Sequence, residues 1–137
     1  MATLLAQRYA RKPANGEWGD ASIFSSSIIL AAAPIADVIN FASLPAGCEV
    51  INVELINDAL GAGVTLNCGY AFVDPTNGTA VPAYYQAAAS KATAGKTSSV
   101  AHPITHNDPT DVTATIAGGA ATGKVTAIIT YRFVGTL

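Results

Sequence analysis

Charged side chains are scarce in this chain. Only 12% of its 137 residues are Asp, Glu, Lys or Arg, which is about half the share found in an ordinary soluble domain. A monomer with so few charges has little colloidal repulsion, so we expect another protein to cover much of its surface. The net charge of −2 supplies no basic excess to bind phosphates, so we expect no nucleic-acid partner.

Long apolar runs and a cysteine framework are also missing. No apolar run approaches the ~20 residues that span a bilayer, and the basic N-terminal residues precede no long apolar core. We therefore expect no membrane partner and no signal peptide. The two cysteines, Cys48 and Cys68, are not spaced as a disulfide framework. Cys68 lies on the apolar face of a predicted strand, which indicates a reduced, buried thiol and folding in a cytosolic compartment.

Sequence patterns typical of catalysis are absent as well. There is no Gly-x-Ser-x-Gly elbow, and the acidic residues are scattered along the chain. Residues 94–97 (Ala-Gly-Lys-Thr) resemble the end of a P-loop, but Ser90 stands where that motif requires its first glycine. We therefore predict a protein that is not an enzyme and holds no cofactor. A carboxylate pair assembled in three dimensions stays open, so a small β-barrel enzyme is kept as the weakest hypothesis.

Two histidines, His102 and His106, are candidate metal ligands together with Asp108 and Asp111. His102 and His106 have the spacing of a helical zinc site, but Pro103 and Pro109 prevent a helix there. In a strand the two imidazoles would lie ~13 Å apart, too far for one ion. A loop can still bring them together, so we predict an exposed polar loop and leave the metal question open.

Alternation of apolar and polar residues dominates the rest of the sequence. Val125, Ala127, Ile129, Tyr131 and Phe133 alternate with more polar neighbours, as in a strand with one buried face. The same alternation recurs in residues 64–72 and 112–116. We therefore expect strand 125–133 to be central to the core.

Turn residues rich in Gly, Pro, Asn and Asp divide the chain into seven or eight segments. We expect residues 111–117 and 124–134 to form a hairpin around 118–123. The Ala-rich segment after Pro82 predicts a short helix that ends at Gly95. The pattern favours an all-β fold, a jelly-roll-like antiparallel β-sandwich forming one domain over residues 20–137. Its predicted strands are 22–31, 36–44, 47–58, 64–73, 100–105, 111–117 and 124–134.

Residues 1–19 differ from this pattern and are interpreted as an N-terminal arm. They hold Arg8, Arg11 and Lys12, three of the seven basic residues, and no acid before Glu17. Gly and Pro residues are expected to keep the arm out of the sandwich, with one short extended or helical stretch at 4–11. Trp18, the only tryptophan, needs an apolar surface to cover. We therefore predict that these four side chains contact a partner.

Tyr84 and Tyr85 form a second candidate contact. Tyrosine is enriched in interface cores, so this pair is typical of a binding patch. Half-buried packing of the predicted Ala-rich helix explains the same two residues equally well. Both interpretations stay open.

Taken together, the chain resembles the small β-sandwich decoration (cement) proteins of tailed bacteriophage capsids. The resemblance rests on the arm ending in Asn15-Gly16-Glu17-Trp18-Gly19-Asp20, on Leu44-Pro45-Ala46-Gly47, and on the Ser/Thr/Ala/Gly-rich strands. It implies a structural virion protein, made in the host bacterial cytoplasm, that lies on the outer capsid surface. The implied partner is the major capsid protein, whose neighbouring subunits it would bridge as a homo-oligomer, a dimer or trimer. The resemblance implies no catalytic residues.

One alternative comes from a related class of virion proteins. A phage tail, fibre or receptor-binding module with a carbohydrate-binding role has the same sequence character. The two hypotheses differ in copy number, because a decoration protein is present in hundreds of copies per particle and a fibre module in few.

Overall fold

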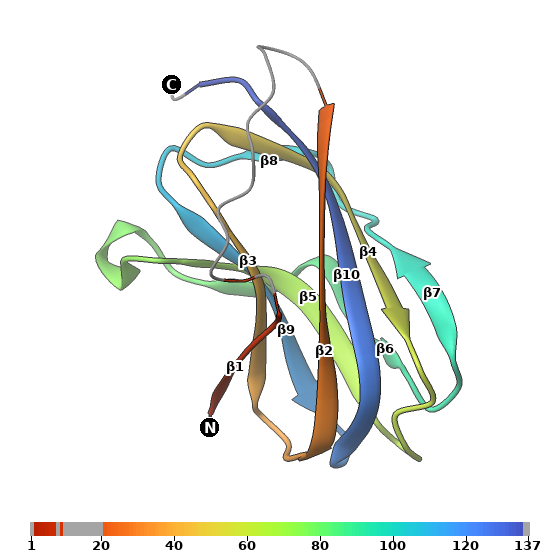
Figure 1. Ribbon diagram of the computed structural model, residues 1–137. Helices are drawn as coiled ribbons and strands as arrows, with labels where there is room; N and C mark the ends of the chain where they lie inside the picture. The colour runs from red at the N-terminus through yellow and green to blue at the C-terminus, as the bar shows by residue number, and fades with distance from the viewer. Residues whose placement is uncertain (1, 8, 10–20, 136–137) are drawn as a thin grey trace.

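The computed structural model describes residues 2–7, 9 and 21–135, and these form two β-sheets packed face to face (Figure 1). The first sheet has the strand order β1-β3-β9-β5-β6, and the second has the order β2-β10-β4-β7. The short strand β8 also pairs with β4. It pairs with Glu49 and Val50 near the start of β4, whereas β7 pairs with residues 54–57 at its end. The strands are β1 (Thr3–Leu5), β2 (Ala21–Ala33), β3 (Val38–Leu44), β4 (Cys48–Asn57), β5 (Thr65–Phe72), β6 (Val81–Ser90), β7 (Gly95–Ser98), β8 (Ile104–Thr105), β9 (Thr110–Ala117) and β10 (Ala121–Phe133).

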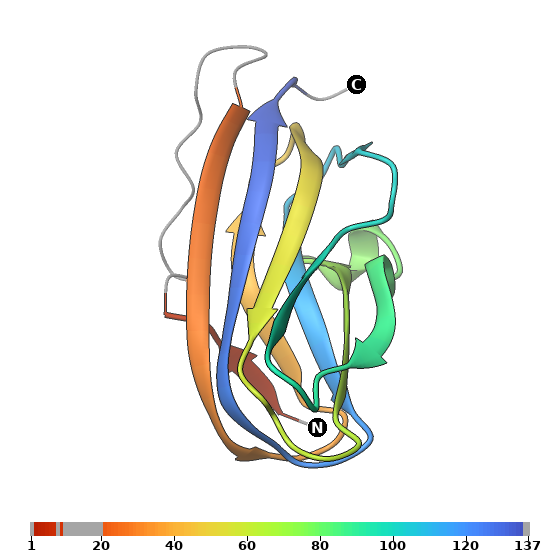
Figure 2. The same ribbon diagram turned by 90° about the vertical axis from the view of Figure 1, so that its right-hand side faces the viewer.

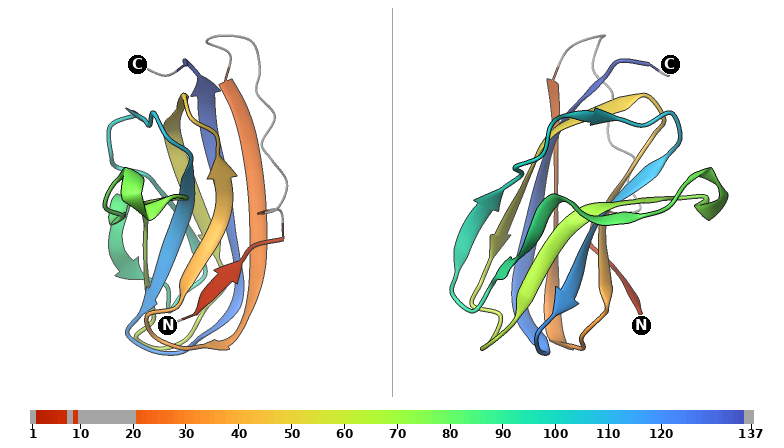
Figure 3. Two further views of the ribbon diagram at one scale, coloured as in Figure 1. Left: turned by 90° about the vertical axis from the view of Figure 1, so that its left-hand side faces the viewer. Right: turned by 180° about the vertical axis from the view of Figure 1, so that it is seen from behind.

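The chain crosses from one sheet to the other at most of its turns. From β2 to β5 consecutive strands alternate between the second and the first sheet, and β9 and β10 do the same. Figure 2 looks onto β2, β10 and β4 of the second sheet, and the left view of Figure 3 looks onto β1, β3 and β9 of the first. This crossing pattern is that of a jelly roll, so the predicted fold class is confirmed.

The core lies between the two sheets and follows the predicted alternation. In β10 the side chains of Val125, Ala127, Ile129 and Tyr131 are at most 2% exposed. They face the inward side chains of β9, which the sequence also predicted as buried. β10 pairs with β2 on one side and with β4 on the other, so this strand is central, as predicted. Both cysteines are buried and neither forms a disulfide bond, which confirms the buried, reduced thiol predicted at Cys68.

Three sequence predictions about single elements are wrong. Residues 81–90 form strand β6, because Leu66 and Cys68 of β5 pair with Ala89 and Gln86 there. This pairing outweighs the helical preference of a run of alanines. β9 and β10 form no hairpin, since they belong to different sheets. Residues 100–105 contribute only the two residues of β8.

The N-terminal segment also departs from its prediction. Thr3–Leu5 pairs with β3 in parallel, so this part of the arm belongs to the first sheet and the sandwich is not purely antiparallel. Residues 10–20, which hold the predicted boundary between arm and domain, lie outside the described residues. The division at residue 19 therefore stays a prediction.

Candidate partner-binding surfaces

The basic cluster predicted to bind a partner lies outside the described residues. This applies to Arg8, Arg11 and Lys12, and also to Trp18. Their contribution to partner binding stays a prediction. The described residues that flank the masked part of the chain are Gln7, Tyr9 and Ala21.

Residues 2–9 are anchored on the side of the sandwich where β2 and β3 lie close together. The Val38 backbone N–H donates to the Ala2 carbonyl (3.0 Å), and the Ala6 N–H donates to the Asn40 carbonyl (3.0 Å). The Gln7 N–H then crosses to the second sheet and donates to the Ser27 carbonyl (2.8 Å). Ala6 is only 4% exposed. The segment therefore ties the two sheets together and contributes to the fold.

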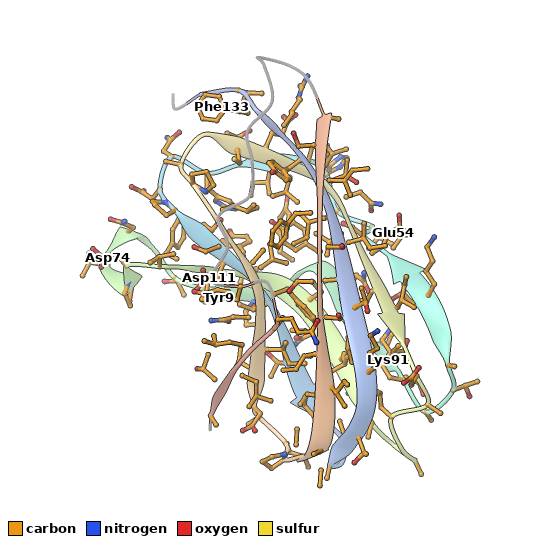
Figure 4. All side chains as sticks on the ribbon, in the orientation of Figure 1. Tyr9, Glu54, Asp74, Lys91, Asp111 and Phe133 are labelled. Carbon is orange, nitrogen blue, oxygen red and sulfur yellow. The ribbon has the colours of Figure 1, made fainter. Side chains whose placement is uncertain are left out.

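Tyr9 extends this anchor onto the first sheet. Its hydroxyl donates to Asp111 Oδ2 of β9 at 3.0 Å, and the two side chains lie together in Figure 4. Burial raises the pKa of Asp111, and the hydroxyls of Tyr9 and Ser43 offset part of the rise. Asp111 Oδ1 is buried with no hydrogen-bond partner. The sequence held no signal for this contact, which joins residues 102 positions apart.

Asp111 also borders a shallow groove on the outer face of the first sheet. The groove has a volume of about 220 Å³ and lies between β1 and β3 on one side and the start of β6 on the other. Most of its polar lining is hydroxyl or amide. A groove of this size is smaller than the usual small-molecule site. Its lining residues are Thr3, Val38, Asn40, Tyr70, Ala71, Ala80, Pro82, Asp111, Thr113 and Thr115.

The predicted tyrosine pair belongs to an aromatic cluster at the edge of the core. The Tyr84 and Tyr85 ring centroids are 5.3 Å apart, and the Tyr70 ring lies 5.5 Å from that of Tyr84. Tyr84 is half-buried and its hydroxyl donates to the His102 carbonyl (3.0 Å). Tyr85 is 2% exposed, and its burial raises the pKa of its hydroxyl. Of the two, only Tyr84 therefore exposes side-chain surface that a partner could contact. Partner binding by either tyrosine stays a prediction.

The two histidines lie in different environments. His102 is exposed, whereas His106 is buried with its ring centroid 4.2 Å from that of Tyr70. Burial lowers the pKa of His106, and its Nε2 has no hydrogen-bond partner. The expected exposed loop is therefore wrong for His106, which packs into the aromatic cluster. No group of three potential metal ligands occurs among the described residues.

The side chains of Lys91, Thr97 and Gln86 form a hydrogen-bonded polar cluster. Lys91 is 1% exposed, and its Nζ donates to Thr97 Oγ1 (2.9 Å), which in turn donates to Gln86 Oε1 (2.8 Å). Burial lowers the pKa of Lys91, and the nearby Cys68 offsets part of this. Burial raises the pKa of Cys68 to about 12. The thiol is therefore protonated at neutral pH and a poor nucleophile.

The outer face of the second sheet is the most apolar exposed surface. Ile23 and Ile29 of β2 are 71% and 70% exposed, and Ile51 and Ile56 of β4 are 36% and 39% exposed. Serine and threonine occupy most positions between them. Its charged residues include two ion pairs, Lys96–Glu54 (2.7 Å) and Arg132–Glu49 (2.6 Å). This face fits the low-charge contact surface that the composition predicts.

A loop between β5 and β6 projects from the sandwich, as the right view of Figure 3 shows. It contains a 3-10 turn at Pro75–Asn77, capped by Asp74, whose Oδ1 accepts from the Thr76 N–H (3.0 Å) and hydroxyl (2.8 Å). Every residue from 74 to 83 is exposed. The predicted turn at this position is confirmed, and its local hydrogen bonds hold it in one shape.

Solved structures with this fold come from phage capsids. A chain in the capsid of Ralstonia phage GP4 superposes with a TM-score of 0.74 at 21% identity, covering 98% of this chain and 99% of that chain. A chain in the cyanophage Pam1 capsid asymmetric unit gives 0.68 at 25% identity, covering 88% and 90%. A chain in the acid-stable capsid of Helicobacter pylori bacteriophage KHP30 gives 0.60 at 19% identity, covering 88% and 93%.

These likenesses show a fold shared over almost the whole of each chain. No protein-family model and no curated protein matches the sequence. The described residues contain no helix long and apolar enough to cross a membrane.

Proposed function

We propose that this chain is a structural virion protein that binds the outer surface of a phage capsid. The observation that carries the proposal is the shared fold with chains of three phage capsid structures, over 88% or more of each chain. The likeness therefore extends over most of the given sequence and is not confined to one part of the sandwich.

The proposed action is mechanical. The chain would bridge neighbouring major capsid protein subunits, as a dimer or trimer, and so hold the shell against internal pressure. Its low charge and its exposed isoleucines supply a surface that gains free energy when another protein covers it. Many copies act on one lattice, so a modest affinity at each contact suffices.

The contacts with the shell are assigned to the N-terminal arm and Tyr84. The basic residues of the arm, Arg8, Arg11 and Lys12, would pair with acidic groups on the shell. Trp18 would cover an apolar site there. Tyr84, half-buried on β6, would contribute at its exposed edge, while Tyr85 supports it from the core.

Binding to capsids that lack the protein tests the proposal. Purified full-length chain is mixed with undecorated capsids, and bound copies are counted by sedimentation and electron microscopy. We expect saturable binding of hundreds of copies per particle. A few copies, all at the tail or its vertex, would support the tail or fibre alternative. Absence of binding to any virion surface would reject both.

A further inference from the structure

We propose that two copies of this chain pair through the outer surface of β2, about a two-fold axis at Ser26. The pairing surface, here called the β2 surface, consists of Ile23, Ser25, Ser27 and Ile29. This inference deepens the proposed function, which gives the pairing its biological use. The pairing itself can be measured without a capsid.

The exposed isoleucines of β2 are the first reason. Ile23 and Ile29 point away from the core and are 71% and 70% exposed. Covering these two side chains removes apolar surface from water, which favours association. β2 has 13 residues and contains no charge, proline or glycine. Covering the outer face of β2 therefore requires no charged side chain of this strand to lose its water.

The second reason is the symmetry of the sequence itself. A two-fold axis at Ser26 relates residue n of one copy to residue 52 − n of the other. Ile23 then meets Ile29 of the second copy, and Ser25 meets Ser27. An isologous interface requires such self-complementary spacing, because the same patch must serve both partners. The occupant that matches this pattern is a second copy of the chain.

The charges beside the β2 surface allow this pairing. On β10, Lys124 pairs with Ile29, and Arg132 pairs with Ala21, at opposite ends of the surface. Arg132 is already neutralised by Glu49 (2.6 Å). In the two-fold arrangement Lys124 of one copy lies level with Ile23 of the other copy. The two Lys124 residues are therefore six strand positions apart, or ~20 Å. This exceeds the Debye length of ~8 Å at physiological salt, so their repulsion is screened.

A groove beside Ile29 gives the incoming isoleucine a place to pack. The groove has a volume of about 300 Å³ and lies between β1 and the second half of β2. Its lining is apolar apart from Asp37. In the proposed register Ile23 of the second copy sits next to this groove, and the symmetry repeats the contact. The lining residues are Leu4, Ile28, Ile29, Leu30, Ala31, Ala33, Pro34 and Asp37.

The hydrogen bonds of β2 decide between its edge and its face. The Ser27 carbonyl, at the centre of the free edge, already accepts from the Gln7 N–H (2.8 Å). A second copy cannot add its own strand there without displacing the N-terminal segment. The outer face of β2 carries no such cover among the described residues. The copies therefore pack face against face, as two sheets do in a sandwich.

The available area is sufficient for a stable pair. Four strands ~4.8 Å apart and ten residues of ~3.4 Å each cover about 34 × 19 Å, or about 650 Å² in projection. Standard interfaces bury about 800 Å² per partner. The standard range is about 600–1,000 Å² per partner, so a pair that covers the whole four-strand face falls within it. Figure 2 shows this face unobstructed by the other described elements.

Sedimentation equilibrium of the full chain is the first test. We expect a dimer at micromolar concentration, and at least a tenfold weaker association in Ile23→Lys and in Ile29→Lys. The matched control is Val73→Lys, since Val73 is 51% exposed and follows β5 of the first sheet, away from the β2 surface and its groove. Circular dichroism verifies that all three variants fold. A monomeric wild-type chain, or equal association of all three variants, overturns the proposal.

Cysteine cross-linking tests the register. We expect a short bis-maleimide to join Ile23→Cys to Ile29→Cys when the two variants are mixed, and to join neither variant to itself as efficiently. The wild-type chain is the control, because Cys48 and Cys68 are buried. Self-linking of Ile23→Cys at the level of the mixture contradicts the axis at Ser26.

Capsid binding of the wild-type chain, compared with its association state in solution, separates this inference from the proposed function. A wild-type chain that is monomeric in solution and still decorates capsids refutes the pairing and supports the function. A wild-type dimer that ignores capsids supports the pairing and refutes the function.

Discussion

At the scale of single residues, the inward side chains of β10 set the stability of the sandwich. Ile129 is fully buried, whereas Ile128 lies on the outer face and is only partly covered. Ile129→Ala should lower the free energy of unfolding by ~2–5 kcal/mol, because it removes buried methyl groups and leaves a cavity. Ile128→Ala is the matched control and should cost clearly less. Chemical denaturation measures both, and a loss below ~0.5 kcal/mol at Ile129 would contradict the core assignment.

Gly69 of β5 is required by a close backbone approach. A Cβ at this position would collide with the Val81 carbonyl oxygen and the Pro82 backbone, where β6 begins. Gly69→Ala should therefore cost ~1–3 kcal/mol, as other overpacked sites do. Gly95→Ala is the control, since nothing lies within 4 Å of its Cβ position. Equal thermal stability of the two variants would mean that β6 does not pass over Gly69.

Lys91 should make stability depend on pH in the alkaline range. Burial lowers its pKa in the folded state below the ordinary 10.5, so the charged form destabilises the fold at neutral pH. As pH rises through the folded pKa towards 10.5, the folded chain loses this proton first and the destabilisation disappears. Lys91→Met should therefore be more stable than wild type at pH 7, with a gap that narrows as pH rises. A constant gap in urea denaturation across this range would show that Lys91 is not responsible.

At the scale of elements, the N-terminal strand is the clearest departure from the sequence-based expectation. The arm was expected to stay out of the sandwich, but its first residues hydrogen-bond to both sheets. Deleting residues 2–9 should now lower Tm by at least ~5 °C, because several net hydrogen bonds of ~1 kcal/mol each are lost.

Tyr9→Phe is the companion variant for that deletion. It removes only the hydroxyl that donates to Asp111, so its effect should be ~0.5–1.5 kcal/mol. Calorimetry of both variants distinguishes the contribution of β1 to stability from that of the Tyr9–Asp111 hydrogen bond. An unchanged Tm in the deletion variant would show that residues 2–9 do not stabilise the sandwich.

Local pattern explains which elements could be predicted from the sequence. In β10 and β9 one face is buried against the core, so alternation is strict and the strands were found. β6 is an irregular strand with register shifts and a run of alanines, and local propensity there favours a helix. Its identity comes from pairing with β5, a tertiary contact that no local pattern reveals. β7 was not predicted, and β8 was predicted only as part of a longer strand, because each is only a few residues long.

The candidate surfaces were predictable to a smaller extent. Composition predicted an apolar contact surface, and the outer face of the second sheet provides one. The symmetric spacing of Ile23 and Ile29 is readable in the sequence, but it gains meaning only when both are known to face outward. The Tyr9–Asp111 contact could not be predicted, because it depends on how the N-terminal segment lies against the first sheet. No local sequence pattern shows that position.

At the scale of the whole molecule, a compact jelly roll with few charges fits a protein that works as one of many copies on a surface. The loop at residues 73–80 extends from the sandwich (Figure 1), whereas the described N-terminal residues pack against both sheets. Heating particles with and without the bound chain should show its mechanical effect. We expect decorated particles to release their contents at a higher temperature, and equal release temperatures would leave the chain without a stabilising role.

The most direct test of the central claim is a cryo-electron microscopy reconstruction of particles assembled with this chain. We predict that density matching the two-sheet sandwich lies on the outside of the shell, in contact with more than one shell subunit and repeated over the lattice. Density for the sandwich only at the tail, or none on the particle, would contradict the account.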